Sequence, residues 1–401
     1  MSAAFEGVRV LDFTINLAGP SASAILADLG ADVIKIERPI TGDDARAFGP
    51  FVGGESITSL WLSRGKRSVE IDLADPEGRA LIQKLLPTAT VVIESFRPGV
   101  MKKHGLDYES VKAVKPDIIY CSVSANGQTG PYAPKPGYDL QAQGMSGLLD
   151  MTGEPDGPPQ RSGTVLGDYV GGLNAWGAIA TALYHHAKTG QGQHLDISLY
   201  EGLVMLNSMV DYVDLDLKPT RTGNHHPNAA PYGIFNGHGG QSAIICAPSD
   251  RLWNKLCDAM QKPQLKTDAR FNNAPARMDN LPGVIDAIEG FLKHYDDIDV
   301  PIKILEDAGI PCCKSVSSHQ VLEDAHLVAR GSVVQLEGTA EMKENGVQGI
   351  RMRGPWVKYS QTPAVMRASG GLGQHNREIL NEAGLSDDQA DALEAKWHAK
   401  K

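Results

Sequence analysis

The first third of the chain alternates short apolar runs with helical stretches, and this alternation constrains the fold more than any other feature. Gly30 gives the first helix a stop, and Pro76 suits the first turn of the second. Short strands separated by helices of this length form βαβ units, because parallel strands need a crossover connection. The sequence therefore predicts an α/β fold with a large, doubly wound parallel sheet. The expected strands are 8–13, 32–37, 68–72, 90–94 and 117–123, and the expected helices are 21–29 and 75–86.

A polar segment rich in Pro, His and Asn, at 218–231, divides the rest of the chain. A chain of 401 residues is long enough for two domains. We expect a first domain over 1–205 and a smaller α/β domain over 220–325. Later strands are expected at 194–198 and 242–246, and helices at 171–186, 252–260, 280–294, 302–308 and 387–398.

Several classes of function are disfavoured by composition. The net charge of −10 argues against a nucleic-acid partner, which needs a basic face, but not against a small anion. The longest weakly polar stretch, 171–184, is about 14 residues, short of the roughly 20 that span a membrane. With no signal-like N-terminus, we expect a cytoplasmic protein without membrane association. The five cysteines lack CxxC spacing and the His pairs lack i, i+4 spacing, so no metal site is predicted.

Basic side chains lie at the ends of the predicted strands or in the loops nearby. Ligands of open α/β sheets bind outside the carboxyl ends of the strands, where Arg and Lys can hold phosphate groups. The alternative is a scatter of solvated surface charges. The loop 14–20 opens a helix, but it lacks the GxGxxG pattern, so a NAD(P)-dependent dehydrogenase is a weak alternative. The basic residues are Lys35, Arg38, Lys66, Arg67, Arg97, Lys102 and Lys103.

Two further segments are candidates for chemistry. Asp168 immediately precedes a helix of small residues, and spacing alone favours a helix N-cap over a nucleophile there. Gly237, His238, Gly239 and Gly240 would allow a mobile loop or a close backbone approach to a ligand. An ordinary turn between two strands explains the same four residues equally well.

The ordered set of short motifs resembles the class III coenzyme A (CoA) transferases, the family that includes formyl-CoA transferase and carnitine CoA-transferase. The likeness spans nearly the whole length. No single motif is unique, but the order of the set is specific. The matching segments are 7–12, 18–20, 29–37, 66–68, 97–99, 105–106, 130–132, 167–168, 189–193, 231–235, 309–311, 322–324 and 372–375.

The resemblance carries implications for the fold. It implies a large CoA-binding domain built from both chain ends, so that residues 330–401 return to the first domain. It also implies a homodimer of two interlinked ring-like chains. Such a dimer buries far more surface than an ordinary interface.

The resemblance also makes the chemistry concrete. Asp168 would be the nucleophile that attacks an acyl-CoA, forming first an aspartyl–acyl anhydride and then an aspartyl–CoA thioester. A carboxylic acid acceptor would then take the CoA. CoA would be a co-substrate, with no permanently bound cofactor. Oxyanion donors are expected near residue 169 and in the 237–240 loop, which would cover the aspartate.

The resemblance also implies contacts with CoA and substrate at positions that match those of the family. Arg38 and Lys103 match CoA-phosphate contacts, with Lys66, Arg67 and Arg97 as weaker matches, and Asn16, Leu17 and Ala18 match the thiol end. Some transferases carry glutamine where this chain has Leu17, which argues against oxalate or formate as substrate. Phe48, Tyr138 and Asp139 are expected near the acyl group. The same fold hosts α-methylacyl-CoA racemases, the alternative activity, but their His-Asp pair is Tyr138-Asp139 here, which breaks a two-base mechanism.

Overall fold

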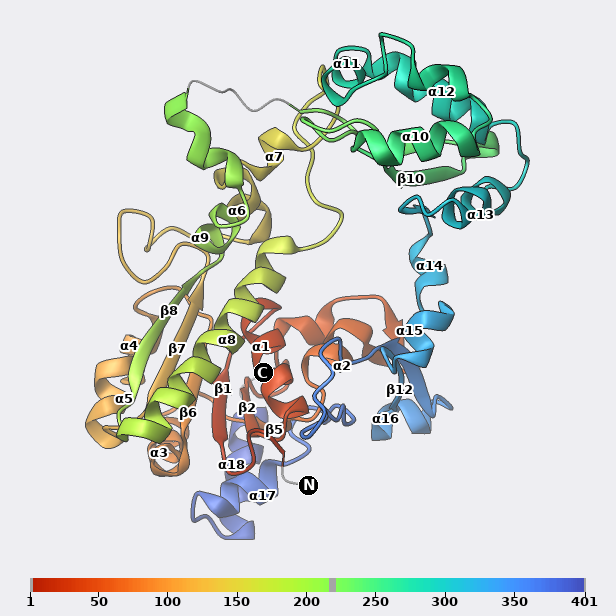
Figure 1. The fold of residues 1–401 in the computed structure, drawn as a ribbon. Helices are drawn as coiled ribbons and strands as arrows, with labels where there is room; N and C mark the ends of the chain where they lie inside the picture. Colours follow the sequence, from red (N-terminus) through yellow and green to blue (C-terminus); the bar gives the residue numbers. More distant parts are fainter. Residues whose placement is uncertain (1–2, 216–220, 400–401) are drawn as a thin grey trace. The chain divides into compact units, whose positions relative to one another are not determined.

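The computed structural model describes residues 3–215 and 221–399, and the chain divides into two compact units (Figure 1). Unit 1 comprises Met1–Leu148, Ser162–Leu215 and Asp324–Lys401. Unit 2 comprises Leu149–Arg161 and Asp216–Glu323. Each unit has its own hydrophobic core, and they are described separately below.

A six-stranded sheet forms the centre of unit 1, in the order β5-β2-β1-β6-β7-β8. All of its neighbouring strands pair in parallel, so the predicted parallel sheet is confirmed. Most residues of β1, β6 and β7 are buried, as expected where helices cover both faces. The direction of winding reverses between β1 and β6. The strands are β1 (Arg9–Phe13), β2 (Asp32–Glu37), β5 (Arg67–Glu70), β6 (Val91–Glu94), β7 (Ile119–Ser124) and β8 (Gln193–Ser198).

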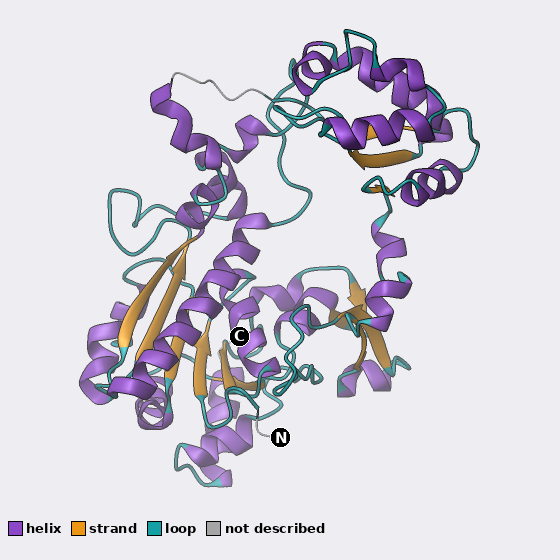
Figure 2. Cartoon of the chain, in the orientation of Figure 1, coloured by secondary structure: helices purple, strands orange, loops and turns teal. Residues whose placement is uncertain are grey.

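Helices cover both faces of this sheet (Figure 2). One face packs against α1 (Ala18–Asp28), α6 (Asp139–Met145), α8 (Leu166–Thr189) and α9 (Leu199–Val204). The other packs against α3 (Pro76–Leu85), α4 (Val100–Lys103), α5 (Tyr108–Val114), α17 (Asn376–Glu382) and α18 (Asp387–His398). The last two helices share a core with strands near the N-terminus, so residues from both ends of the chain form one core.

Helices α1 and α8 approach each other closely because small residues lie at their contact. A Cβ atom added at Gly172 of α8 would lie 2.0 Å from Ser21 Oγ and 2.7 Å from the carbonyl oxygen of Ala18. Real Cβ atoms do not approach other atoms so closely, so a larger residue at position 172 would separate the helices. The small residues that suggested a helix in the sequence therefore have a packing role.

A small cluster joins the C-terminal part of unit 1 to a helix near its start. The hairpin of β12 (Val333–Glu337) and β13 (Gly349–Arg353) packs Leu336 and Met352 against Trp61 of α2 (Ile57–Leu62). Leu17 and Tyr169 contact the same cluster. The remaining elements nearby are β3 (Phe51–Val52), β4 (Glu55–Ser56), α15 (Ala325–Ala329) and α16 (Ala340–Glu344).

Unit 2 is a three-stranded antiparallel sheet with helices packed on one face. Alternate residues of β9 are buried, and Phe235 of that strand belongs to the same core as Trp253. The strands are β9 (Tyr232–Asn236), β10 (Ser242–Cys246) and β11 (Cys312–Lys314). The principal helices are α10 (Asp250–Ala259), α11 (Ala274–Asp279), α12 (Leu281–Leu292) and α13 (Asp299–Asp307).

Residues 149–161 differ from the expected division, which placed them with the first domain. Their contacts lie instead in unit 2. The backbone N–H of Gly223 donates to Gly153 O at 3.0 Å, and Arg221 Nη1 donates to Asp150 O at 3.0 Å. These bonds join segments about 70 residues apart, which local sequence patterns do not reveal. Separately, none of the described helices combines the length and apolarity that crossing a bilayer requires.

Candidate active site

A cleft of about 600 Å³ lies at the carboxyl edge of the large sheet. Ligands of open α/β folds bind outside this edge where the winding direction reverses, which here is between β1 and β6. The loops after these two strands are tied together, because the N–H of Ile15 donates to Ser95 Oγ at 2.8 Å. The cleft is lined by segments 13–15, 35–43 and 71–74 and by Phe96, Val100, His104 and Trp397.

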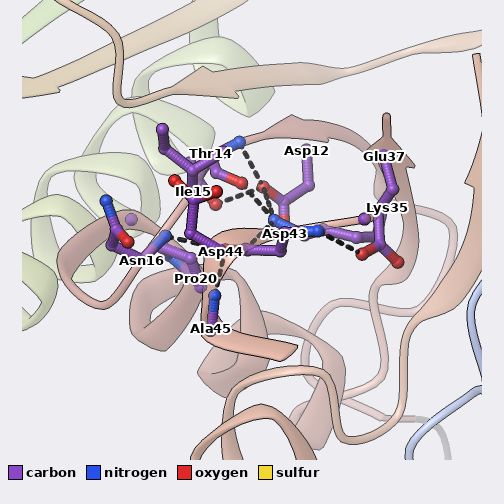
Figure 3. Close-up of polar contacts among 12 residues, drawn as sticks. Asp12, Thr14, Ile15, Asn16, Pro20, Lys35, Glu37, Asp43, Asp44 and Ala45 are labelled. Carbon is purple, nitrogen blue, oxygen red and sulfur yellow. Dashed lines mark hydrogen bonds and ion pairs between the residues drawn. The ribbon is translucent and has the colours of Figure 1, made fainter. Parts of the chain in front are cut away.

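A buried ionic network supports the loop that enters α1 (Figure 3). The fully buried Asp12 accepts hydrogen bonds from the Thr14 N–H at 2.9 Å, Ser23 Oγ at 2.7 Å and Lys66 Nζ at 2.9 Å. Lys35 lies 3.9 Å from the same carboxylate. Burial alone would raise the pKa of Asp12, but the two lysines and the hydroxyl donors lower it to about 2.

Asp43 extends this network to the loop backbone. Its Oδ2 pairs with Lys35 Nζ at 2.9 Å, and its Oδ1 accepts the N–H of Asn16 at 2.9 Å and of Ala45 at 3.0 Å (Figure 3). Asn16 has a φ of 65°, in the left-handed region that few non-glycine residues adopt. Asp43 therefore fixes the backbone turn that presents Asn16, Leu17 and Ala18.

Two of the predicted phosphate contacts are corrected by their positions. Lys66 is buried, and its amine is bonded to Asp12, Ser23 and the carbonyl of Pro20. Arg67 begins β5, so it lies at the amino edge of the sheet, opposite the cleft. There it pairs with Asp32 at 2.7 Å, Glu378 at 2.9 Å and Glu382 at 2.7 Å. Neither residue offers free charge to a ligand in the cleft.

The other predicted contacts are accessible. Arg38 lines the cleft, is 58% exposed, and pairs with Asp44. Lys103 and Arg97 are exposed, and neither has an ion pair within the described residues. Arg97 lines a separate cavity of about 280 Å³ beside Glu94, rather than the main cleft. His104, which follows α4, lines the main cleft and was not predicted from the sequence.

Asp168 lies in the first turn of α8, and it is not the N-cap. The N-cap is Val165, which makes no side-chain capping bond. The Asp168 carboxylate is half-buried and has neither a hydrogen bond nor an ion pair in the part of the chain that the structure describes. Burial, with the nearby charge of Asp139, raises its pKa to about 7. An unpartnered carboxylate with a raised pKa is typical of a functional site.

Asp139 is held beside Asp168 by hydrogen bonds to both of its oxygens. Its Oδ1 accepts the N–H of Gly167 at 2.6 Å, so Asp139 caps α8 from a neighbouring helix. Its Oδ2 accepts from Gln143 Nε2 at 2.6 Å. The amide oxygen of Gln143 accepts the N–H of Ser162 at 3.1 Å. Gln143 was not predicted, although it follows Asp139 at i, i+4 spacing on one helix face.

The position of Asp168 is tied to the loop before α1. Residues 168 and 172 lie on one face of α8 because they are four apart. Gly172 touches Ala18 and Ser21 of α1. One turn earlier on the same face, Asp168 therefore lies toward the loop of Asn16 and Leu17. The structure brings these predicted residues to one region of unit 1.

Two of the expected oxyanion donors, the N–H groups of Tyr169 and Gly237, already donate within the protein. The N–H of Tyr169 donates to Val165 O at 3.2 Å as part of α8. The glycine segment forms the turn between β9 and β10, with the N–H of Gly237 donating to Gln241 O at 2.7 Å. His238 is exposed and lies 3.6 Å from Asp296, while Gly239 and Gly240 complete the turn. These contacts form a turn between the two strands, the alternative that the sequence left open. The covering of Asp168 by this segment stays a prediction.

Two aromatic candidates are exposed. Phe48 follows a short helical turn, and Tyr138 is the N-cap of α6, immediately before Asp139. Their exposed fractions are 45% and 73%. No cluster of three or more His, Cys, Asp or Glu side chains within the described ranges could hold a metal ion.

Comparisons with known proteins agree with these features. A family model described as CoA-transferase family III matches residues 5–376. The succinate–glutarate CoA-transferase of Agrobacterium fabrum is 38% identical, over 94% of this chain and 95% of that protein. The succinyl-CoA–D-citramalate CoA-transferase of Chloroflexus aurantiacus is 36% identical over 98% and 97%. The acetyl-CoA:oxalate CoA-transferase of Acetobacter aceti is 37% identical over 83% and 89%.

Solved structures show the same fold. A CAIB/BAIF family protein from Brucella suis superimposes with a TM-score of 0.85 and 35% identity, covering 96% of this chain and all of that one. A protein from Mycobacterium tuberculosis gives a TM-score of 0.80 and 28% identity, covering 94% and 98%.

Proposed function

The chain belongs to CoA-transferase family III and is an acyl-CoA:carboxylate CoA-transferase, and we propose that Asp168 carries the transfer through covalent intermediates. The observation that carries the proposal is its half-buried carboxylate, which has no partner among the described residues. A carboxylate without donors keeps its lone pairs available for attack. Asp139, fixed by Gly167 and Gln143, adds negative charge that makes Asp168 more basic than an ordinary aspartate.

The reaction proceeds in four exchanges at carbonyl carbons. An oxygen of ionised Asp168 bonds to the donor thioester carbon, and the C–S bond breaks to give an anhydride and CoA thiolate. The thiolate attacks the Asp168 carbonyl, forming aspartyl–CoA and releasing the donor acid. The acceptor carboxylate attacks this thioester and displaces the thiolate. The thiolate then attacks the acceptor's carbonyl, giving the new acyl-CoA and free Asp168.

The cleft at the carboxyl edge is the proposed site of CoA. Its volume of about 600 Å³ suits a nucleotide-sized group. Arg38 at its wall and Lys103 on α4 offer charge for phosphates. The loop of Asn16, Leu17 and Ala18 leads from this cleft toward Asp168, which supports a path for the thiol-bearing arm along it.

The relatives support a substrate class. Their names specify succinate, glutarate, D-citramalate, mesaconate and oxalate, which are dicarboxylic acids. We propose that this enzyme accepts dicarboxylic acids of four or five carbons. Leu17 in place of a glutamine argues against the shortest of them, oxalate. Family membership also supports a homodimer, which size-exclusion chromatography with light scattering would test.

Intact-protein mass after mixing with succinyl-CoA tests the covalent step. We expect an adduct of CoA less one water, removed by hydroxylamine and mapped to the peptide of Asp168. Asp168→Ala should lose the adduct and lower transfer by at least about 10³-fold, whereas Asp388→Ala, at an exposed position on α18, should keep both. Undiminished turnover by Asp168→Ala would exclude the proposed mechanism. Exchange of the α-proton without any adduct would favour a racemase.

A further inference from the structure

A cation with no acidic partner among the described residues lies against the residue that follows Asp168. Arg353, the last residue of β13, donates from Nη2 to the hydroxyl of Tyr169 at 2.7 Å. Its guanidinium lies 3.9 Å from the centre of the Trp61 ring and 5.2 Å from that of Tyr169. Three elements, α2, α8 and β13, therefore meet at this guanidinium.

Arg353 keeps most of its hydrogen-bonding capacity. A guanidinium has five N–H donors, and the Tyr169 hydroxyl takes one. Within the described residues Arg353 has no ion pair, and its side chain is exposed. By contrast, the arginines that brace the sheet face carboxylates, as Arg46 faces Glu37 and Arg64 faces Asp28. Arg353 is free to bind a ligand carboxylate through two parallel N–H groups.

The two aromatic rings that contact Arg353 are held in place by their neighbours. The rings of Trp61 and Tyr169 meet edge to face, 5.8 Å apart at 82°. Trp61 is buried, and Arg64, held by Asp28, lies 4.4 Å from the centre of its ring. Leu17 packs into the same cluster. The cluster therefore joins the loop before α1 to the first turn of α8, the two segments that position the nucleophile.

A dicarboxylic substrate needs a cation in this region. Its second carboxylate would approach two negative residues, Asp139 and ionised Asp168, and like charges repel. Lys35 and Lys66 cannot compensate, because Asp12 and Asp43 already bind them. Arg353 contacts Tyr169, the residue that follows Asp168, so it is a cation near the proposed nucleophile that no protein carboxylate among the described residues neutralises.

We propose that Arg353 binds the remote carboxylate of a dicarboxylic acyl group while its other carboxyl carbon reacts at Asp168. This inference rests on the proposed function of Asp168. A monocarboxylic acid of equal length gains nothing from Arg353, so the residue sets preference for diacids.

The test compares kcat/KM for dicarboxylic and monocarboxylic acids of equal chain length in the same variant. For Arg353→Met, kcat/KM should fall about 10–100-fold with succinate and glutarate, the loss expected for a charge-assisted hydrogen bond. With butyrate and pentanoate as acceptors it should change less than about threefold, and KM for a monocarboxylic donor such as butyryl-CoA should stay the same. Arg353→Lys should fall between wild type and Arg353→Met for the diacids, because ammonium keeps charge without the fork.

Controls separate the possible outcomes. Arg330→Met, an exposed arginine of the same unit outside the cluster, should leave both kinds of acid unchanged. Equal losses for diacids and monoacids in Arg353→Met would mean that Arg353 only supports Tyr169, and no change would remove it from the site. Either result overturns the inference but leaves the proposed function standing. Failure of wild-type enzyme to form any adduct on Asp168 would instead defeat the proposed function.

Discussion

Asp12 and Asp168 belong to the same unit, yet their surroundings shift their pKa values in opposite directions. Asp12 is fully buried and surrounded by Lys35, Lys66 and hydroxyl donors, and its pKa is about 2. Asp168 is half-buried, has no partner among the described residues, and has a pKa of about 7. Burial raises both values, so the partners decide the outcome. A buried carboxylate without hydrogen-bond donors around it is available for chemistry. A buried carboxylate that accepts hydrogen bonds and ion pairs has a structural role instead.

The largest expected effect is a loss of stability when Asp12, the carboxylate with ion-pair partners, is removed. Asp12→Ala leaves two lysines facing only Asp43 in a buried space, and breaking such a pair costs about 3–5 kcal/mol. Urea denaturation should therefore show a large loss in the free energy of unfolding. Asp168→Asn, measured in parallel, should show no loss. A cost below about 1 kcal/mol for Asp12→Ala would mean that the network is not a source of stability.

The next effect is a gain in stability when Asp168 loses its charge. Because its folded pKa is raised, the native state keeps this proton as pH rises through 4, where the unfolded chain releases it. Wild-type stability should thus fall between about pH 4 and 7 relative to Asp168→Asn. Above pH 7 the variant should be more stable by about 1–3 kcal/mol, with no difference near pH 4. Parallel stability curves across this range would contradict the raised pKa.

The smallest effect concerns the like charge beside the nucleophile. The proposed mechanism requires ionised Asp168, so kcat/KM should rise with pH to a plateau, with a midpoint near pH 7. Asp139→Asn should move the midpoint down by less than about one pH unit, because burial is the larger cause. A pH profile from 5 to 9 measures this shift.

A second variant controls for the altered hydrogen bonds. In Asp139→Asn the new amide would face Gln143. Adding Gln143→Glu restores an acceptor there, still accepts the Ser162 N–H and returns one negative charge, so the midpoint of the double variant should move back toward the wild-type value. An unmoved midpoint in Asp139→Asn alone would exclude Asp139 as a cause of the raised pKa.

The sheet was predictable because its signals are local. Apolar runs such as 32–37 and helix signals such as Gly30 and Pro76 lie within single elements. The assignment of Arg67 as a phosphate contact was wrong, although its place in the sequence indicates the correct edge. Arg67 is the first residue of its strand, whereas Arg38 follows the last residue of one. Strand ends determine the edge at which a residue lies.

The environment of Asp168 was not predictable in the same way. Asp139 reaches Gly167 across 28 positions, and Lys66 reaches Asp12 across 54. No periodic pattern encodes such contacts, so neither the burial of Lys66 nor the role of Gln143 was visible. The Gly237–Gly240 segment was ambiguous because a turn and a loop share one composition, and the pairing of β9 with β10 shows that it joins two adjacent strands.

The contact of α1 with α8 at Gly172 has a consequence for how new specificities arise. The loop before α1 and the proposed nucleophile Asp168 belong to two closely packed helices, where a side chain at position 172 would clash with Ala18 and Ser21. The β12–β13 hairpin contributes to the same region from a separate, later segment of the chain. On the proposed roles of Arg353 and Asp168, we expect exchange of this hairpin to change substrate preference while the residues proposed for covalent transfer stay the same.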